Sequence, residues 1–208
     1  MHRKQQEHPM KIAVLGTGKV GTALGTKLTS TGHDVVYGSR EPSDAAQTFS
    51  LRKALDSADV VITAVPGTEV VTMLEAIGDD VLGDKIVLDP SAAFTPEMAM
   101  AYPGDSVGQR VQARFPKARV VKTLNTMNFT IMVDPMSSVS QATVFVSGDD
   151  ARAKSFVHAL LKDLGWPEHS ILDLGGIETA LATEHAAPLF FATVMALKTP
   201  TFNLSISR

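Results

Sequence analysis

The feature that most constrains the fold is a glycine-spaced segment near the start of the chain. An apolar run over 12–15 leads into Gly16, Gly18 and Gly21, spaced as G-x-G-x-x-G, and apolar residues at helical spacing follow over 19–31. A strand, this spacing and a helix, in that order, are typical of a dinucleotide-binding unit, where the glycines allow a tight turn, close approach of a pyrophosphate and helix packing. The helix N-terminus then presents free N–H groups to the phosphates. The alternative is a plain structural β-turn-α unit.

The end of the next predicted strand decides between NAD and NADP. An NAD-binding unit usually ends this strand with Asp or Glu, about 20 residues after the glycines, to bond the ribose 2′-hydroxyl. Here the strand over 34–37 is followed by Gly38, Ser39 and Arg40, and the first acid, Glu41, comes only after the arginine. A carboxylate at the tip would repel a 2′-phosphate, whereas a hydroxyl and a guanidinium can bind one. The sequence therefore predicts NADP(H); the alternative is that Arg40 is a solvated loop charge.

Strand and helix patterns continue to alternate beyond these two strands, which predicts an α/β fold, a Rossmann-type doubly wound parallel sheet with right-handed crossovers. The expected strand order is 3-2-1-4-5-6, with the ligand at the carboxyl ends near the switch between strands 1 and 4. We assign 10–208 to one NADP-binding Rossmann domain with a small C-terminal helical lobe, about 175–208, and 1–9 to a disordered extension. The predicted strands are 11–15, 34–37, 59–65, 85–89, 119–124, 142–146 and 171–174.

Helical patterns lie between these strands. Thr68 and Asp149 are the expected N-caps of two of the helices, because short polar side chains at that place accept a bond from a free backbone N–H. Phe156 is expected on a buried helix face. The predicted helices after the first cover 45–56, 68–77, 106–115, 150–164 and 178–197, the last interrupted by Pro188.

Composition limits the function classes. The 208 residues carry a net charge of -3 without a basic block, so nothing indicates a nucleic acid or an anionic membrane as partner. The absence of cysteine excludes disulfides and zinc-thiolate sites, and the five histidines other than His185 lack ligand spacing, so we predict no metal site. Residues 1–9 lack the apolar core of a signal peptide, from which we expect a cytoplasmic location. The apolar run ending at Leu197 is shorter than the roughly 20 residues of a membrane span, so we expect no membrane helix.

The carboxyl ends of the predicted strands define the cofactor site. A dinucleotide laid across them has its adenosine end by the strand 34–37 and its nicotinamide near the ends of 85–89 and 119–124. Asn125 follows the last of these strands, where it is a candidate to bond the nicotinamide carboxamide or the hydride acceptor; the alternative is a turn-forming asparagine. The predicted cofactor-binding residues are Gly16, Thr17, Gly18, Lys19, Val20, Gly21, Ser39, Arg40, Ala64, Val65, Pro66 and Asn125.

Several short runs, spread over nearly the whole chain from Met10 onward, resemble one enzyme family. They are VLGTGKVG (14–21), YGSR (37–40), AVP (64–66), VKTLNT (121–126), VFVSGD (144–149), LGGIET (174–179) and PTFN (200–203). These runs look like the NADP oxidoreductases that depend on coenzyme F-420, a deazaflavin, and a ferric-reductase domain of membrane proteins shares the pattern. The resemblance implies a single Rossmann domain with a small C-terminal lobe, NADP(H) as cofactor, hydride exchange between nicotinamide and deazaflavin, and often a homodimer.

Hydride transfer between two ring systems needs no catalytic acid, because the cofactors carry the reaction and the protein positions them. The absence of a base in a dehydrogenase motif argues against an ordinary alcohol or hydroxyacid dehydrogenase. Asn125 and His185 are weak catalytic candidates; His185 would suit as proton donor to a reduced acceptor, and the alternative is a packing role. The expected wall of the acceptor pocket is Phe94, Met127, Phe129 and Phe202.

Two further expectations concern assembly and function class. The segment 188–197 is apolar on more sides than one small domain covers, so we expect a homodimer built on it. Two function classes stay open: an NADP(H)-dependent oxidoreductase with a deazaflavin or flavin-like acceptor, and a non-catalytic NADP(H)-binding regulatory or sensor protein. The residues expected at the dimer interface are Leu189, Phe190, Phe191, Val194, Met195 and Leu197.

Overall fold

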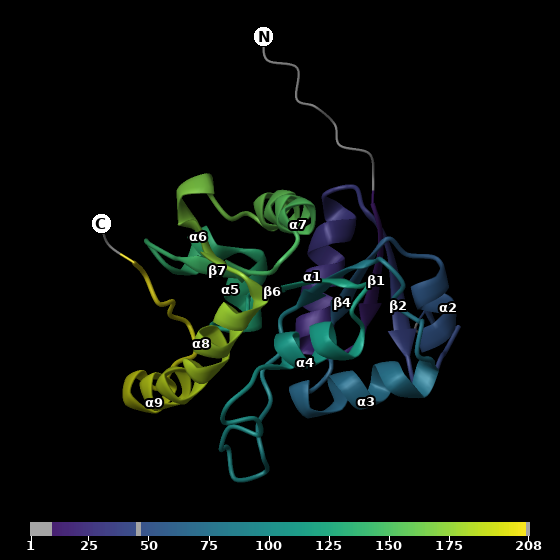
Figure 1. The fold of residues 1–208 in the computed structure, drawn as a ribbon. Helices are drawn as coiled ribbons and strands as arrows, with labels where there is room; N and C mark the ends of the chain where they lie inside the picture. Colours follow the sequence, from purple (N-terminus) through teal and green to yellow (C-terminus); the bar gives the residue numbers. More distant parts are fainter. Residues whose placement is uncertain (1–9, 45–46, 207–208) are drawn as a thin grey trace.

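A computed structural model of the chain describes residues 10–44 and 47–206, so the predicted extension 1–9 lies outside the described residues. The described part contains an eight-stranded sheet in the order β3-β2-β1-β4-β5-β6-β7-β8, with helices packed around it (Figure 1). Among the strand pairs of this sheet, as far as the chain is described, only β6–β7 is antiparallel. The predicted Rossmann-type α/β fold is confirmed. The strands are β1 (Lys11–Leu15), β2 (Asp34–Ser39), β3 (Thr48–Ser50), β4 (Val60–Thr63), β5 (Ile86–Asp89), β6 (Arg119–Thr123), β7 (Val144–Ser147) and β8 (Ile171–Gly175).

Helices cover both faces of the sheet and enclose two hydrophobic cores (Figure 1). In β1, Ile12 and Val14 point into the core under α1, α5 and α7, while Ala13 and Leu15 point into the core under α2, α3 and α4. All four side chains are fully buried, as expected for a strand inside a parallel sheet. The helices are α1 (Lys19–Ser30), α2 (Leu51–Asp56), α3 (Gly67–Ile77), α4 (Val107–Arg114), α5 (Phe129–Val133), α6 (Pro135–Ser138), α7 (Ala151–Asp163), η1 (Glu168–Ser170), η2 (Ile177–Thr179), α8 (Ala180–His185) and α9 (Ala187–Leu197).

The sheet contains the expected strand order 3-2-1-4-5-6, but the strand numbered 3 is not the segment that we predicted for it. The strand predicted as third, 59–65, forms β4 beside β1. The outer strand β3 has only three residues and pairs with the end of β2, within the segment 45–56 that we expected to hold a short helix; α2 covers its second half. Three residues are too few to show a period-two pattern, so β3 could not be recognised from sequence. The switch point therefore lies between β1 and β4.

The sheet departs from the parallel prediction at β7. The chain between β6 and β7 forms only the short helices α5 and α6, and β7 runs back along β6 with antiparallel pairing. A parallel pair needs a crossover that returns the chain along the length of the sheet, and α5 and α6 are too short to do so although the connection over 124–143 has enough residues. Strand β8 then pairs with β7 in parallel after the long helix α7.

Three local expectations were wrong. Pro66, not Thr68, is the N-cap of α3, because the helix begins at Gly67, two residues earlier than a cap at Thr68 implies. Asp150, not Asp149, caps α7 by accepting a bond from the Ala153 N–H, while Asp149 accepts a bond from the Ile177 N–H. Phe156 is 41% exposed on the outer face of α7 instead of buried.

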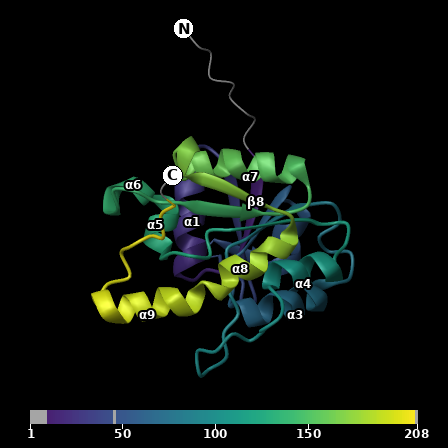
Figure 2. The same ribbon diagram turned by 60° about the vertical axis from the view of Figure 1, so that its left-hand side comes forward.

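The C-terminal helical lobe consists of η2, α8 and α9, and α9 projects from the rest of the molecule (Figure 2). The helix breaks at Ala186, so that Pro188 lies in the first turn of α9, where proline is tolerated. Together these helices span the 21 residues Ile177–Leu197 and contain an 18-residue window with a mean hydropathy of 1.3, which by length and composition alone suffices to cross a membrane. This stretch includes η2 and α8 and is therefore longer than the apolar run ending at Leu197 that we expected to be too short. Within it, however, Glu184 is fully buried and paired with Lys122 of β6.

Candidate cofactor and acceptor site

The glycine segment forms the turn between β1 and α1, and each glycine meets a different constraint. Gly16 has a φ of +114°, and a Cβ there would lie 2.4 Å from the Ala64 carbonyl oxygen. A Cβ on Gly21 would lie 2.1 Å from the Gly16 carbonyl oxygen, so this position allows the helix to pack against the turn. A Cβ on Gly18 would meet no protein atom within 4 Å. The open side of Gly18 is where a pyrophosphate would approach the backbone.

The N-terminus of α1 suits an anion. Gly18 is its N-cap, no side chain caps the helix, and its first turn contains no acidic residue. The predicted phosphate-binding residues Thr17, Lys19 and Val20 surround this end, and Lys19 is exposed. Uncapped N–H groups, the positive end of the helix dipole and a nearby ammonium all favour phosphate oxygens.

The tip of β2 opens into a groove of about 760 Å³ that Ser39 and Arg40 line together with residues of α2 and α3. The Ser39 hydroxyl oxygen accepts a bond from the Glu41 N–H at 3.1 Å, which leaves its hydrogen to donate to a ligand. The Arg40 guanidinium lies 3.2 Å from the Glu69 carboxylate and is 75% exposed. Both groups are therefore at the place where the adenosine end of a dinucleotide would lie.

The residues after β4 complete the same edge of the sheet. Ala64 and Val65 lie directly beside Gly16, and Pro66 ends the segment as the N-cap of α3. The switch point between β1 and β4 is thus formed by the glycine turn on one side and by this short segment on the other. Ligands of doubly wound sheets bind in the crevice at such a point.

Asn125 follows β6 under backbone strain and with an unpaired amide. Leu124, directly before it, is 1% exposed and has a φ of +65°, which is rare for a branched residue and costs about 1–3 kcal/mol. The Asn125 Nδ2 atom is buried and has no hydrogen-bond partner among the described residues. A buried donor without a partner is costly, and a carboxamide oxygen of a nicotinamide would satisfy it. The residues present therefore fit NADP(H) at both ends.

The predicted wall of the acceptor pocket is only partly assembled. Phe94 contacts Phe191 of α9 edge to face at 5.2 Å, and Phe202 stacks on Phe190 at 5.1 Å, so these rings form one aromatic cluster. Met127 is buried and reaches the same region through Asn203, whose Nδ2 lies 3.9 Å from the Met127 sulfur. Phe129 instead lines a groove of about 890 Å³ along α1.

His185 has an ordinary packing contact. Its Nε2 lies 3.3 Å from the Tyr102 carbonyl oxygen, and the ring is half-buried between α8 and the loop after β5. This contact agrees with the packing alternative, while the role of proton donor stays a prediction. Among residues 10–44 and 47–206, no group of three or more His, Asp or Glu side chains could bind a metal ion.

Sequence reasoning missed a buried ionic cluster at the ends of β5 and β6. The Lys122 ammonium contacts the Asp89 carboxylate at 3.0 Å and the Glu184 carboxylate at 2.5 Å, and all three side chains are fully buried. Burial raises the pKa of Glu184, opposed by the Lys122 charge. The signal in the sequence is a lysine inside the apolar strand 119–124 and a glutamate in an apolar helix, since buried charges must be paired.

Comparison with known proteins agrees with this geometry. Residues 11–93 match the family model for NADP oxidoreductases, coenzyme F420-dependent. A crystal structure of a provisionally assigned F420-dependent NADP reductase from Arthrobacter sp. FB24 is 36% identical, with a TM-score of 0.88 over 96% of this chain and 100% of that one.

Two further proteins are less similar. The metalloreductase STEAP3 of Rattus norvegicus is 30% identical over 187 residues, which are 86% of this chain but only 36% of that protein, so the chain spans about a third of its curated relative. An imine reductase from Aspergillus terreus, in complex with NADPH4, is 18% identical with a TM-score of 0.66 over 91% of this chain and 64% of that one, a likeness of fold alone. The glycine turn, the acid-free tip of β2 and the full-length match to the Arthrobacter structure together show that this chain belongs to the family of coenzyme F420-dependent NADP oxidoreductases.

Proposed function

We propose that this protein transfers hydride between the nicotinamide of NADP(H) and a deazaflavin or flavin-like acceptor. The observation that carries the proposal is the unpaired Asn125 amide at the end of β6, at the same edge of the sheet as the uncapped α1 N-terminus and the arginine at the β2 tip. These groups suit a carboxamide, a pyrophosphate and a 2′-phosphate in the order in which NADP(H) carries them.

The protein's part in such a reaction is position and exclusion of water. Bound NADPH supplies the hydride and becomes NADP⁺, and the reduced acceptor takes its proton from solvent. The Asn125 amide orients the nicotinamide ring, and the α1 N-terminus fixes the pyrophosphate. The aromatic cluster of Phe94, Phe191 and Phe202 offers an apolar surface for a planar acceptor.

A turnover screen separates the enzyme from a sensor. NADPH oxidation is measured by absorbance with oxidised coenzyme F420, FMN and a quinone as acceptors, alongside calorimetric titration of NADPH. Turnover with F420 or FMN supports the proposal. Tight NADPH binding without turnover with any acceptor would favour the non-catalytic regulatory or sensor protein. A search for deazaflavin in extracts of the source organism then shows whether F420 itself is available there.

Arg40→Ala is expected to weaken NADPH binding about 10- to 150-fold and to leave NADH affinity unchanged. A hydrogen bond to a charged group contributes about 1.5–3 kcal/mol, and only NADPH carries the 2′-phosphate. Calorimetric titration of both cofactors measures the two affinities. Arg52→Ala is the matched control, because Arg52 lines the same groove but pairs with Asp56 in its own helix. Equal NADPH and NADH affinities in the parent protein would exclude the assignment of NADP.

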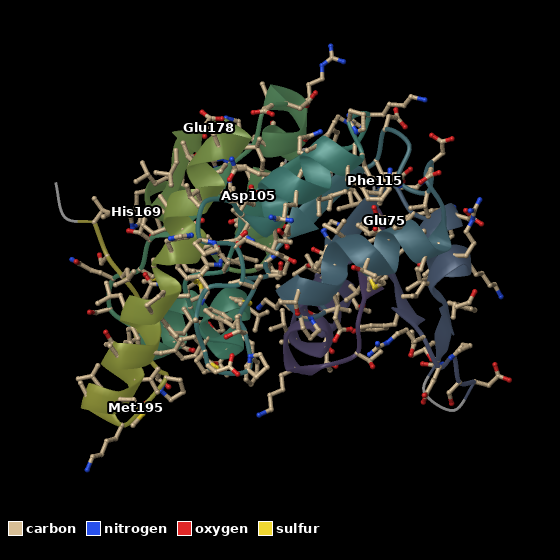
Figure 3. All side chains as sticks on the ribbon, turned by 60° about the horizontal axis from the view of Figure 1, so that its bottom comes forward. Glu75, Asp105, Phe115, His169, Glu178 and Met195 are labelled. Carbon is tan, nitrogen blue, oxygen red and sulfur yellow. The ribbon has the colours of Figure 1, made fainter. Side chains whose placement is uncertain are left out.

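We also propose a homodimer built on α9. Leu189, Met195 and Leu197 are 56%, 78% and 56% exposed on the projecting helix, where Met195 is labelled in Figure 3. Phe190 and Phe191, which we expected at the interface, contact Phe202 and Phe94 of their own chain as members of the aromatic cluster. Exposed apolar side chains this close together usually mark an interface, and a two-fold axis would bring the same patch of both copies together.

Light scattering at micromolar concentration should give twice the chain mass of 22.2 kDa. Met195→Glu is expected to shift the protein to the monomer, since a charge at the centre of an apolar interface is desolvated without a partner. Met136→Glu on α6, where the methionine is 48% exposed, is the control and should stay dimeric. A parent mass near 22 kDa that persists on concentration would exclude the dimer.

A further inference from the structure

The cluster of Asp89, Lys122 and Glu184 lies at the same carboxyl edge of the sheet as the cofactor site, but the proposed function assigns it no role. Besides the two carboxylates, the Lys122 ammonium donates to the Ser91 carbonyl oxygen. One Asp89 oxygen accepts bonds from the Thr63 hydroxyl at 2.9 Å and from the Ser91 N–H at 3.0 Å. The cluster therefore joins the ends of β4, β5 and β6 and the start of the loop after β5.

Glu184 connects this cluster to the C-terminal lobe. One of its carboxylate oxygens contacts Lys122 and also accepts a bond from the Val107 N–H at the start of α4, at 2.8 Å. The other side chains that α8 buries are small, Ala180 and Thr183. Small side chains bury little apolar area, so the directional contacts between α8 and the sheet are the Glu184–Lys122 ion pair and, at the N-cap of the helix, the Thr179 hydroxyl that bonds the Ser147 hydroxyl of β7 at 2.7 Å.

The aromatic cluster combines a ring from the loop after β5 with rings from the C-terminal lobe, and the position of α8 affects both parts. The loop over 90–105 contacts the lobe twice, through the Tyr102 carbonyl oxygen against His185 and through Phe94 against Phe191. Phe191 lies on α9, which is joined to α8 at Ala186. A displacement of α8 would therefore move α9 and release the loop.

We propose that Glu184 is a positioning residue that, through Lys122, fixes α8 to the sheet and thereby holds Phe191 of α9 and Phe94 of the loop after β5 in contact. The use of these rings as a surface for the acceptor rests on the proposed function; the mechanical link itself does not. A buried ion pair is a poor source of stability, because desolvation of the two charges offsets their attraction. It is, however, strongly directional, because the charged groups must meet at hydrogen-bond distance.

The test compares Glu184→Ala with Glu184→Gln by hydrogen–deuterium exchange. The alanine variant removes the contacts of Glu184 with Lys122 and with the Val107 N–H, and it leaves the Asp89–Lys122 pair intact. It is expected to raise exchange about tenfold or more in both 91–104 and 180–197, because a charge-assisted buried bond is lost. The glutamine variant keeps an oxygen for Lys122 and Val107 and should retain the exchange rates of the parent. Glu178→Ala is the control, since Glu178 is an exposed carboxylate on the same lobe, labelled in Figure 3.

Ligand measurements distinguish positioning from loss of the fold. With NADPH as donor and oxidised F420 and FMN as probe acceptors, Glu184→Ala should raise the acceptor KM while the NADPH Kd stays within about twofold. Unchanged exchange in 180–197, a rise confined to 180–197, or an equal rise in β1 and β4 would overturn the proposal. Absence of turnover by the parent protein would count against the proposed function alone, because exchange and NADPH binding still decide on the link.

Discussion

Replacing Gly18 with valine is expected to abolish NADPH binding while the protein stays folded. Gly18 has φ and ψ of -74° and -174°, which valine adopts readily, and a Cβ there meets no protein atom within 4 Å. The added side chain would occupy the space that the pyrophosphate needs. One lost hydrogen bond to a charged group costs about 1.5–3 kcal/mol, so losing several weakens binding by more than about 100-fold. Calorimetric titration gives the affinity, and circular dichroism with thermal denaturation gives the fold.

Two other glycines provide controls for this result. A Cβ on Gly104 also meets open space, but in the loop after β5, so Gly104→Val should bind NADPH like the parent. Gly16→Val should instead lose stability, because its Cβ overlaps the Ala64 carbonyl and its φ of +114° is strained for valine. Normal NADPH binding by a folded Gly18→Val protein would show that the dinucleotide binds elsewhere.

Lys122→Met is expected to cause the largest loss of stability among single substitutions of charged residues. The methionine fits the volume but leaves the carboxylates of Asp89 and Glu184 buried without their cation. Removing one partner of a buried ion pair lowers the free energy of unfolding by about 3–5 kcal/mol. Chemical denaturation followed by circular dichroism measures this change from the midpoint and the slope.

We expect the stability of the protein to depend less on the presence of the three charged side chains than on each buried charge having a partner. The triple variant Asp89→Asn, Lys122→Met, Glu184→Gln is expected to regain much of the lost stability, since neutral side chains avoid the cost of desolvated charge. Lys162→Met is the control, because the Lys162–Glu168 pair is exposed and screened by solvent, and its midpoint should match the parent. A midpoint for Lys122→Met equal to that of Lys162→Met would contradict the buried network.

The sequence alone determined those features that depend on residues close together in the chain. The glycine spacing after an apolar run identified the β1–α1 turn, and the missing acid after 34–37 identified the tip of β2, because both signals are local chemistry. The alternation of strands and helices likewise fixed the fold class. Each of these patterns reports how a short segment must bury its apolar side or accommodate its backbone.

Only the tertiary structure decided which distant segments meet. The strand β3 is too short to leave a pattern, and the antiparallel β7 follows from the lack of a crossover helix after β6. The strain at Leu124 became visible only from its backbone, and the pairing of Lys122 with Glu184 required α8 to be placed against the sheet. Such contacts leave no periodic pattern in the sequence. A charged residue in an apolar segment indicates that a partner exists, but only the packing of the folded chain determines which residue that partner is.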